Sequence, residues 1–178
     1  MTFQLTEPIL VIGLGGVGTR LAEKTKKSLN SDCLMISHDQ NDLTAENSIK
    51  ISTKSVVNPS THLIRGSTLE TSDEIKKNIT NYSTIILMSN LAGKAGTGIG
   101  PIVSKICNQE QKNLLSFAVM PFKFEKERIF QSGIALKRIR QDSQCTIVVD
   151  NDALLDSNPD LTQKQCYDIS NNAIESMV

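Results

Sequence analysis

The sequence predicts an α/β fold in which a doubly wound, mostly parallel sheet carries helices on both faces. Short apolar runs rich in Ile, Val and Leu alternate with segments of helical periodicity. Two of these runs end in glycine-rich turns, a common junction between a strand and a helix. Aromatic residues make up 4% of the chain and Trp is absent, so the core must be aliphatic. With 178 residues, the chain is expected to form one domain, 1–178.

The N-terminal part contains two predicted strands joined by a helix. Residues 9–12 form a compact apolar run that ends in glycines. Residues 17–29 follow, with their apolar side chains on one side and lysines elsewhere, which predicts a helix. The second apolar run, 33–36, precedes a polar stretch that contains Asp39 and Asp42.

The segment from 41 to 68 has no clear periodicity. Asn58-Pro59-Ser60 and Arg65-Gly66-Ser67 have the composition of loops, and we expect loops at both places. From Ser72 to Asn81 the spacing of two isoleucines predicts a helix with acidic residues at its start.

The next part of the chain repeats the strand and helix pattern. Residues 84–88 predict a buried strand, and a glycine-rich loop is expected over 93–100. Pro101 then predicts the start of a helix that covers 101–111, because proline is favoured in a first helical turn.

Two further strands and two further helices are expected in the C-terminal part. Residues 114–120 and 146–149 predict strands, the first stopped by a proline. Residues 125–141 and 161–178 predict helices.

Charge and composition exclude several classes of function. Nineteen Lys and Arg residues balance nineteen Asp and Glu residues, which argues against a nucleic-acid binder or a polybasic membrane protein. There is no apolar run of transmembrane length, and the first residues do not resemble a signal peptide. The four cysteines lie far apart, so we expect neither a metal site nor a catalytic thiol. These features predict a cytoplasmic protein.

The first glycine-rich turn, Gly13-Leu-Gly15-Gly16-Val-Gly18, fits the G-x-G-x-x-G pattern. Glycines there allow backbone N–H groups to approach phosphate oxygens at a helix N-terminus. Asp39 lies 21 residues beyond Gly18, where a dinucleotide-binding fold places the acid that binds ribose. The alternative is a tight turn that binds no ligand.

The second turn, Gly93-Lys-Ala-Gly-Thr-Gly-Ile-Gly100, has four glycines in eight residues. It lacks the final Lys-Ser/Thr pair of a Walker loop. Two such turns after two strands could hold one polyphosphate from both sides, whereas a flexible surface turn would rarely need four glycines.

Five segments, in order, resemble the GTP-binding domain of the tubulin/FtsZ superfamily. Residues 11–18 are similar to its first phosphate loop, and 92–98 are similar to its GGGTGTG signature, with Ala92, Lys94 and Ala95 as departures. Pro121-Phe-Lys-Phe-Glu125 resembles a segment that holds ribose, and 150–155 resembles one that contacts guanine. The fifth segment is the last helix, with Tyr167 and Asn171.

This resemblance implies a site for GTP or GDP, with Mg²⁺ as an accompanying ion. It implies ribose binding by Glu125 and guanine binding by Asn151, Tyr167 and Asn171. Plainer roles are a solvated Glu125, an Asn151 that caps the turn at 151–156, and a Tyr167 in the core. The implied phosphate-binding residues are Gly15, Gly16, Val17, Lys94, Ala95, Gly96, Thr97 and Gly98.

The departures leave some roles open. The Lys94 ammonium could add a charge-assisted contact to the β- or γ-phosphate, or it could point into water and narrow the loop. Where FtsZ carries Asn-Thr-Asp this chain has Ser37-His-Asp39, so that only Asp39 matches. The region 58–72 matches the family too poorly for any residue to be assigned.

The resemblance also bears on catalysis and partners. In the family, the acidic catalytic loop and the C-terminal domain would lie beyond Val178, so no catalytic residue is expected here and hydrolysis should be weak or need a partner subunit. The implied partners are a second copy or a full-length FtsZ- or tubulin-like protein, in a cytoskeletal or cell-division filament. The alternative is an NAD(P)- or adenylate-binding enzyme of the Rossmann type that uses Gly13–Gly18 and Asp39.

Overall fold

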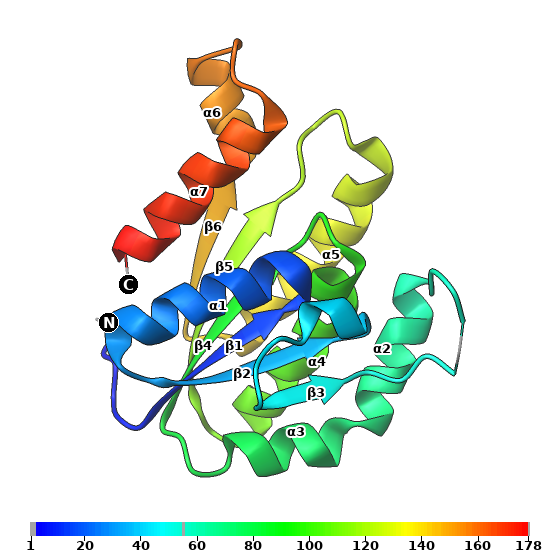
Figure 1. Cartoon of the computed structure of the whole chain (residues 1–178), viewed down its shortest axis with the longest axis vertical. Coiled ribbons are helices and arrows are strands. Elements are labelled where there is room, and N and C mark those ends of the chain that lie inside the picture. Colours follow the sequence, from blue (N-terminus) through cyan, green and yellow to red (C-terminus); the bar gives the residue numbers. More distant parts are fainter. Residues whose placement is uncertain (1–2, 55, 178) are drawn as a thin grey trace.

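The computed structural model describes residues 3–54 and 56–177, and in them six parallel strands form one sheet (Figure 1). The strand order is β3-β2-β1-β4-β5-β6. The strands are β1 (Ile9–Leu14), β2 (Asp32–Ser37), β3 (Ser48–Lys50), β4 (Thr84–Asn90), β5 (Asn113–Met120) and β6 (Cys145–Asp150). The predicted strands are thus confirmed, and the sheet has the doubly wound topology that was expected.

Helices cover both faces of the sheet. On one face, α1 (Gly15–Leu29) and α7 (Gln163–Met177) pack on alternate residues of the strands such as Val11 and Phe117. The other face is covered by α2 (Thr61–Glu70), α3 (Ser72–Ile79), α4 (Lys94–Gln109) and α5 (Lys126–Asp142). Two short helices, η1 (Gln40–Asp42) and α6 (Asn151–Ser157), follow β2 and β6. The central strands are therefore buried on both sides, which explains their continuous apolar runs.

The predicted loop at Arg65-Gly66-Ser67 is wrong, because these residues lie inside α2. The Ser60 hydroxyl caps this helix by accepting a hydrogen bond from the Leu63 N–H at 3.2 Å. Ile64 and Thr68 are fully buried, so packing outweighs the low helix propensity of Gly66.

The predicted start of a helix at Pro101 is also wrong, because α4 begins at Lys94 and contains Pro101 in its interior. Proline has no N–H to donate to the carbonyl of the residue four positions earlier, Thr97. That carbonyl instead accepts a hydrogen bond from Nη2 of Arg65 in α2, at 3.3 Å. The neighbouring helix thus supplies the donor that Pro101 lacks.

Two glycines in α4 are required by close packing. A methyl group at Gly98 would lie 2.8 Å from Cγ2 of Ile64, and one at Gly96 would overlap the carbonyl oxygen of Asn90. Within the expected loop at 93–100, residues 94–100 are therefore the first part of a tightly packed helix, and Gly93 precedes it. No helix in the described part of the chain is both long and apolar enough to cross a membrane.

Candidate functional site

The candidate site lies where β1 and β4 end side by side in the sheet. The two strands are paired and parallel, and α1 and α4 begin close to their carboxyl ends. Along the chain the sheet grows first from β1 towards β3, then from β4 towards β6, so this position is the topological switch point. Open α/β sheets bind ligands in the crevice at such a point.

The N-terminus of α1 presents free backbone donors. Its first residues are Gly15, Gly16 and Val17. Their N–H groups have no hydrogen-bond acceptor within the helix, because no helical carbonyl lies four residues before them. Leu14 provides no side-chain cap, and the first turn holds no acidic residue. Gly15 has a φ of +64°, a conformation that residues with a Cβ rarely adopt.

The N-terminus of α4 has the same character. Gly93 precedes the helix without a side-chain cap, no acid lies in the first turn, and Lys94, Ala95 and Gly96 come first. The Thr97 N–H is already bonded to the Gly93 carbonyl at 3.2 Å. Thr97 and Gly98 therefore lie beyond the free amides of this helix, although both are among the predicted phosphate-binding residues.

The two N-termini meet. A methyl group at Gly15 would lie 2.7 Å from the Cβ of Ala95. Each helix carries the equivalent of about half a positive charge at this end. Two such ends share one crevice, with no capping side chain and no acidic residue of their own in the first turns, and they favour a polyanion. The Asp42 carboxylate, from the loop after β2, is the acid that lies beside Gly16 and opposes this effect.

Two aspartates follow β2, and they have different surroundings. Asp39 accepts hydrogen bonds from the backbone N–H and the side-chain amide of Asn41, at 2.9 and 3.0 Å. Asp42 accepts a bond from the Ser37 hydroxyl at 2.7 Å, and its Oδ1 would lie 2.6 Å from a methyl group at Gly16. Sequence reasoning selected Asp39 and missed Asp42 as the acid beside α1. The sequence does show a second acid, Asp42, three residues after Asp39, and that spacing is one turn of the short helix η1.

His38 stands next to these acids with an unused ring nitrogen. Its Nδ1 is buried and has no hydrogen-bond partner among the described residues. Burial lowers the pKa of His38. The negative charges of Asp39 and Asp42 oppose that change, and the positive charge of Lys94 adds to it. The loop after β2 and the start of α4 are therefore close enough for their charges to interact.

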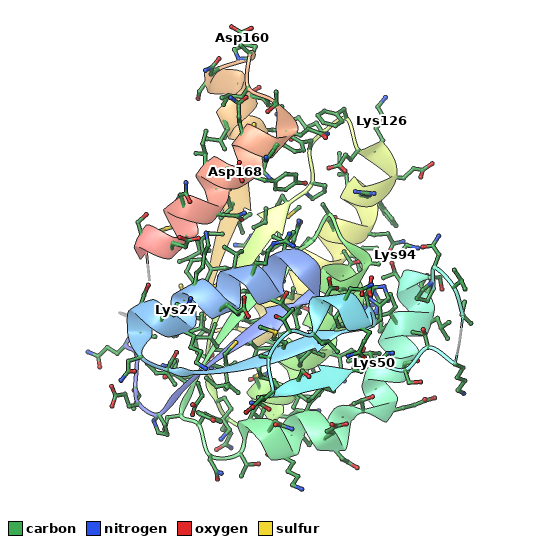
Figure 2. The ribbon with its side chains drawn as sticks, in the orientation of Figure 1. Lys27, Lys50, Lys94, Lys126, Asp160 and Asp168 are labelled. Carbon is green, nitrogen blue, oxygen red and sulfur yellow. The ribbon has the colours of Figure 1, made fainter. Side chains whose placement is uncertain are left out.

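Lys94 is exposed, and its ammonium is bonded to the loop before α2. Its ammonium donates hydrogen bonds to Oδ1 of Asn58 at 2.6 Å and to the Pro59 carbonyl at 3.0 Å. In Figure 2, Lys94 lies beside the loop that leads into α2.

Glu125 precedes α5 and is held on both sides. Its Oε2 accepts a bond from the Phe122 N–H at 3.0 Å, and its Oε1 accepts one from Nη1 of Arg128 at 2.8 Å. Its side chain is only 17% exposed, so it is not the freely solvated carboxylate of the plainer interpretation.

Tyr167 and Asn171 lie on α7, one turn apart. The Tyr167 ring meets Phe122 edge to face, with ring centroids 5.5 Å apart. Burial raises the pKa of Tyr167, and the nearby charge of Glu125 adds to this effect. The Oδ1 atom of Asn171 is buried and has no hydrogen-bond partner among the described residues. A buried acceptor of this kind is costly unless a ligand or water satisfies it.

Asn151 is fully buried, and its amide is engaged inside the protein. Its Nδ2 donates to the Met120 carbonyl at 3.2 Å, and its Oδ1 accepts from the Ser170 hydroxyl at 2.6 Å. It thus ties the end of β5 to α7, next to Asn171. The first residue of α6 is Asn151, and the cap of that helix is the Asp150 side chain.

The structure therefore brings most of the predicted residues to one end of the sheet. Val17 and Tyr167 pack against the same apolar cluster, and α7 lies against α1 (Figure 1). Glu125 and Tyr167 are close enough for the charge of the carboxylate to raise the pKa of the tyrosine. Asn151 connects the end of β5 to α7 through Met120 and Ser170.

Comparisons with known proteins agree with this architecture. The family model described as "Tubulin/FtsZ family, GTPase domain" matches residues 59–159. Cell division protein FtsZ 1 of Halobacterium salinarum is 26% identical over 184 residues, which cover 96% of this chain and 46% of that protein. FtsZ of Haloferax mediterranei is 31% identical over 107 residues, or 60% of this chain and 28% of that protein.

Solved structures show the same fold. The empty FtsZ dimer structure from M. jannaschii superposes with a TM-score of 0.82 at 22% identity, over 94% of this chain and 52% of that one. TubZ of Clostridium botulinum phage c-st gives 0.70 at 16% identity, over 93% of this chain and 56% of that one. The chain spans about half the length of the FtsZ and TubZ chains that it matches over nearly its whole length. The matched segment, more than half of the chain, shows that this protein belongs to the Tubulin/FtsZ family through its GTPase domain.

Proposed function

We propose that residues 1–178 form a single domain that binds GTP or GDP, with Mg²⁺, at the end of the sheet where α1 and α4 begin. The observation that carries this proposal is the meeting of the two uncapped helix N-termini at Gly15 and Ala95. The backbone N–H groups of 15–17 and 94–96 would bind the phosphate oxygens. Thr97 and Gly98 would support this turn by packing.

Asn171 and Tyr167 would select the base. Guanine presents N–H donors and a carbonyl acceptor along one edge, and an asparagine amide offers one acceptor and two donors. The unpaired Oδ1 of Asn171 matches the N–H donors of that edge. The Tyr167 ring, held by Phe122, offers an apolar surface for stacking.

Glu125 and Asn151 would have distinct parts. Each carboxylate oxygen of Glu125 has a second lone pair, so Glu125 can accept bonds from ribose hydroxyls while it holds Arg128. Asn151 has no exposed surface, and we assign it to positioning α7 through Ser170.

Hydrolysis by residues 1–178 alone is expected to be slow. Phosphoryl transfer depends on groups that orient the attacking water and stabilise the developing charge. In the described part of the chain we identify residues that would hold the nucleotide, and none that would orient this water. The two relatives described above are cell division proteins, so we propose a filament of a longer relative, or a second copy of this chain, as the partner.

Calorimetric titration with GTP, ATP and NAD in magnesium buffer tests the function. We expect GTP to bind about two orders of magnitude or more tighter than ATP, since adenine would leave the Asn171 acceptor unpaired. Asn171→Ala should abolish this preference, and Asn172→Ala, an exposed neighbour on the same helix, should keep it.

Equal affinities for GTP and ATP in the unmodified protein would remove the guanine assignment. Binding of NAD alone would favour the dinucleotide alternative. The comparisons do not support that alternative.

A further inference from the structure

We propose that the Lys94 ammonium distinguishes a nucleoside triphosphate from a diphosphate, by exchanging its bonds at Asn58 and Pro59 for the terminal phosphate. This proposal rests on the proposed function, and it concerns how the same site recognises the length of the phosphate chain. Lys94 is the first residue of α4, so its ammonium is carried by the turn whose free amides would bind phosphate.

The present partners of Lys94 are neutral. Both are oxygen acceptors without charge, the Asn58 amide at 2.6 Å and the Pro59 carbonyl at 3.0 Å. None of the ion pairs among the described residues includes Lys94. A phosphate oxygen carries negative charge, so its bond to the ammonium would add a Coulombic attraction that the neutral oxygens of Asn58 and Pro59 do not provide. A phosphate oxygen that came within reach would therefore compete successfully with Asn58 and Pro59.

Space is available beside this side chain. A cavity of about 520 Å³ lies between α2, α4 and α5, and Lys94, Thr97 and Arg128 are among its lining residues. Lys94 is exposed, so its side chain can move without disturbing the core. Arg128 on the opposite side is already paired with Glu125, which leaves Lys94 as the lining cation that has no carboxylate partner among the described residues.

The exchange would also change the loop before α2. Asn58 has a φ of +56°, and Ser60, two residues on, caps α2. Lys94 thus tethers the residues that directly precede this cap. Binding of a triphosphate would release the tether, whereas a diphosphate, which ends at the backbone amides, would leave it in place.

The test compares GTP and GDP affinities in magnesium buffer for the full chain and three variants. We expect GTP to bind about tenfold tighter than GDP, which corresponds to about 1.4 kcal/mol. Lys94→Met should bring this ratio close to one, with GDP affinity changed by less than about twofold because the backbone amides remain. Lys105→Met removes an exposed lysine from the same helix and should keep the original ratio.

Asn58→Ala tests the exchange itself. It removes the present partner but leaves the ammonium, so GTP affinity should rise while GDP affinity stays unchanged. An unchanged GTP-to-GDP ratio in Lys94→Met would overturn this proposal, as would equal binding of GTP and GDP by the unmodified protein. If those results came with a preserved preference for GTP over ATP, the proposed function would stand. Absence of guanine-nucleotide binding would overturn both.

Discussion

Asn151 and Asn171 have the same side chain and the same predicted role, yet the structure gives them opposite surroundings. Both polar ends of Asn151 are bonded inside the protein, whereas Oδ1 of Asn171 is buried without a partner. A satisfied buried amide contributes to stability, and an unsatisfied one opposes it. The first is therefore suited to holding the fold, and the second to binding a ligand.

This difference predicts opposite effects of two alanine substitutions. Asn151→Ala removes both buried hydrogen bonds, to the Met120 carbonyl and from the Ser170 hydroxyl, so the free energy of unfolding should fall by about 1–3 kcal/mol. Asn171→Ala removes an unpaired acceptor and should leave that free energy within about 0.5 kcal/mol of its original value. Urea denaturation of both variants without nucleotide measures this. The assignment fails if Asn171→Ala is the more destabilising of the two.

At the level of elements, α4 shows where sequence reasoning reached its limit. Glycine and proline both disfavour helix, so 93–100 read as a loop and 101 as a helix start. The deciding interactions are tertiary: Arg65 bonds to the Thr97 carbonyl, and Gly98 lies against Ile64. Such contacts join residues more than thirty positions apart and leave no local pattern. The central strands β1, β2, β4 and β5, by contrast, were predictable because burial on both faces requires unbroken apolar runs. The three-residue edge strand β3 has no such run and was not predicted.

The interaction between Arg65 and the carbonyl near Pro101 predicts energetic coupling. Arg65→Met leaves the Thr97 carbonyl without a donor and should cost about 1–3 kcal/mol of unfolding free energy. In a Pro101→Ala background the new N–H can bond to Thr97 within the helix, so the same substitution should cost less. A double-mutant cycle by chemical denaturation should give a coupling energy of about 1 kcal/mol. Additive effects would show that Arg65 does not substitute for the missing donor.

The helical position of Gly66 predicts a stabilising substitution. Gly66 is exposed within α2, and a methyl group there would meet no atom within 4 Å. Gly66→Ala should therefore raise the unfolding free energy by about 0.5–1 kcal/mol. Gly133→Ala in α5 has the same open surroundings and serves as the positive control. A loss of stability in Gly66→Ala alone would favour the loop expected from the sequence.

On the scale of the whole molecule, the candidate site joins parts of the chain from Gly15 to Asn171 and both helical layers of the sheet. Most of these residues were proposed from the sequence because the order of motifs along the chain can be read without knowledge of packing. The sequence could not show that Asn151 is enclosed or that Lys94 is bonded to Asn58. The burial of Asn151 depends on the packing of α7, and the bond of Lys94 depends on the position of the loop before α2.

A ligand that bridges these parts should stabilise the whole fold. At a free GTP concentration of one hundred times Kd, the unfolding free energy should rise by about 2.7 kcal/mol, because a ligand that binds only the folded state stabilises it by this amount. For a chain of this size that corresponds to a rise in Tm of roughly 5–10 °C.

The effect should be strongest at α7, whose docking on α1 includes the exposed Lys24–Glu175 pair at 2.6 Å. Such a pair contributes at most about 1 kcal/mol, so α7 has stability to gain from a nucleotide that contacts Asn171. Hydrogen exchange should therefore slow in the amides of α7 when GTP is added, and ATP at the same concentration should protect them much less. In Asn171→Ala the two nucleotides should act alike. Protection of α1 and α4 without α7 would mean that the phosphates are held and the base is not.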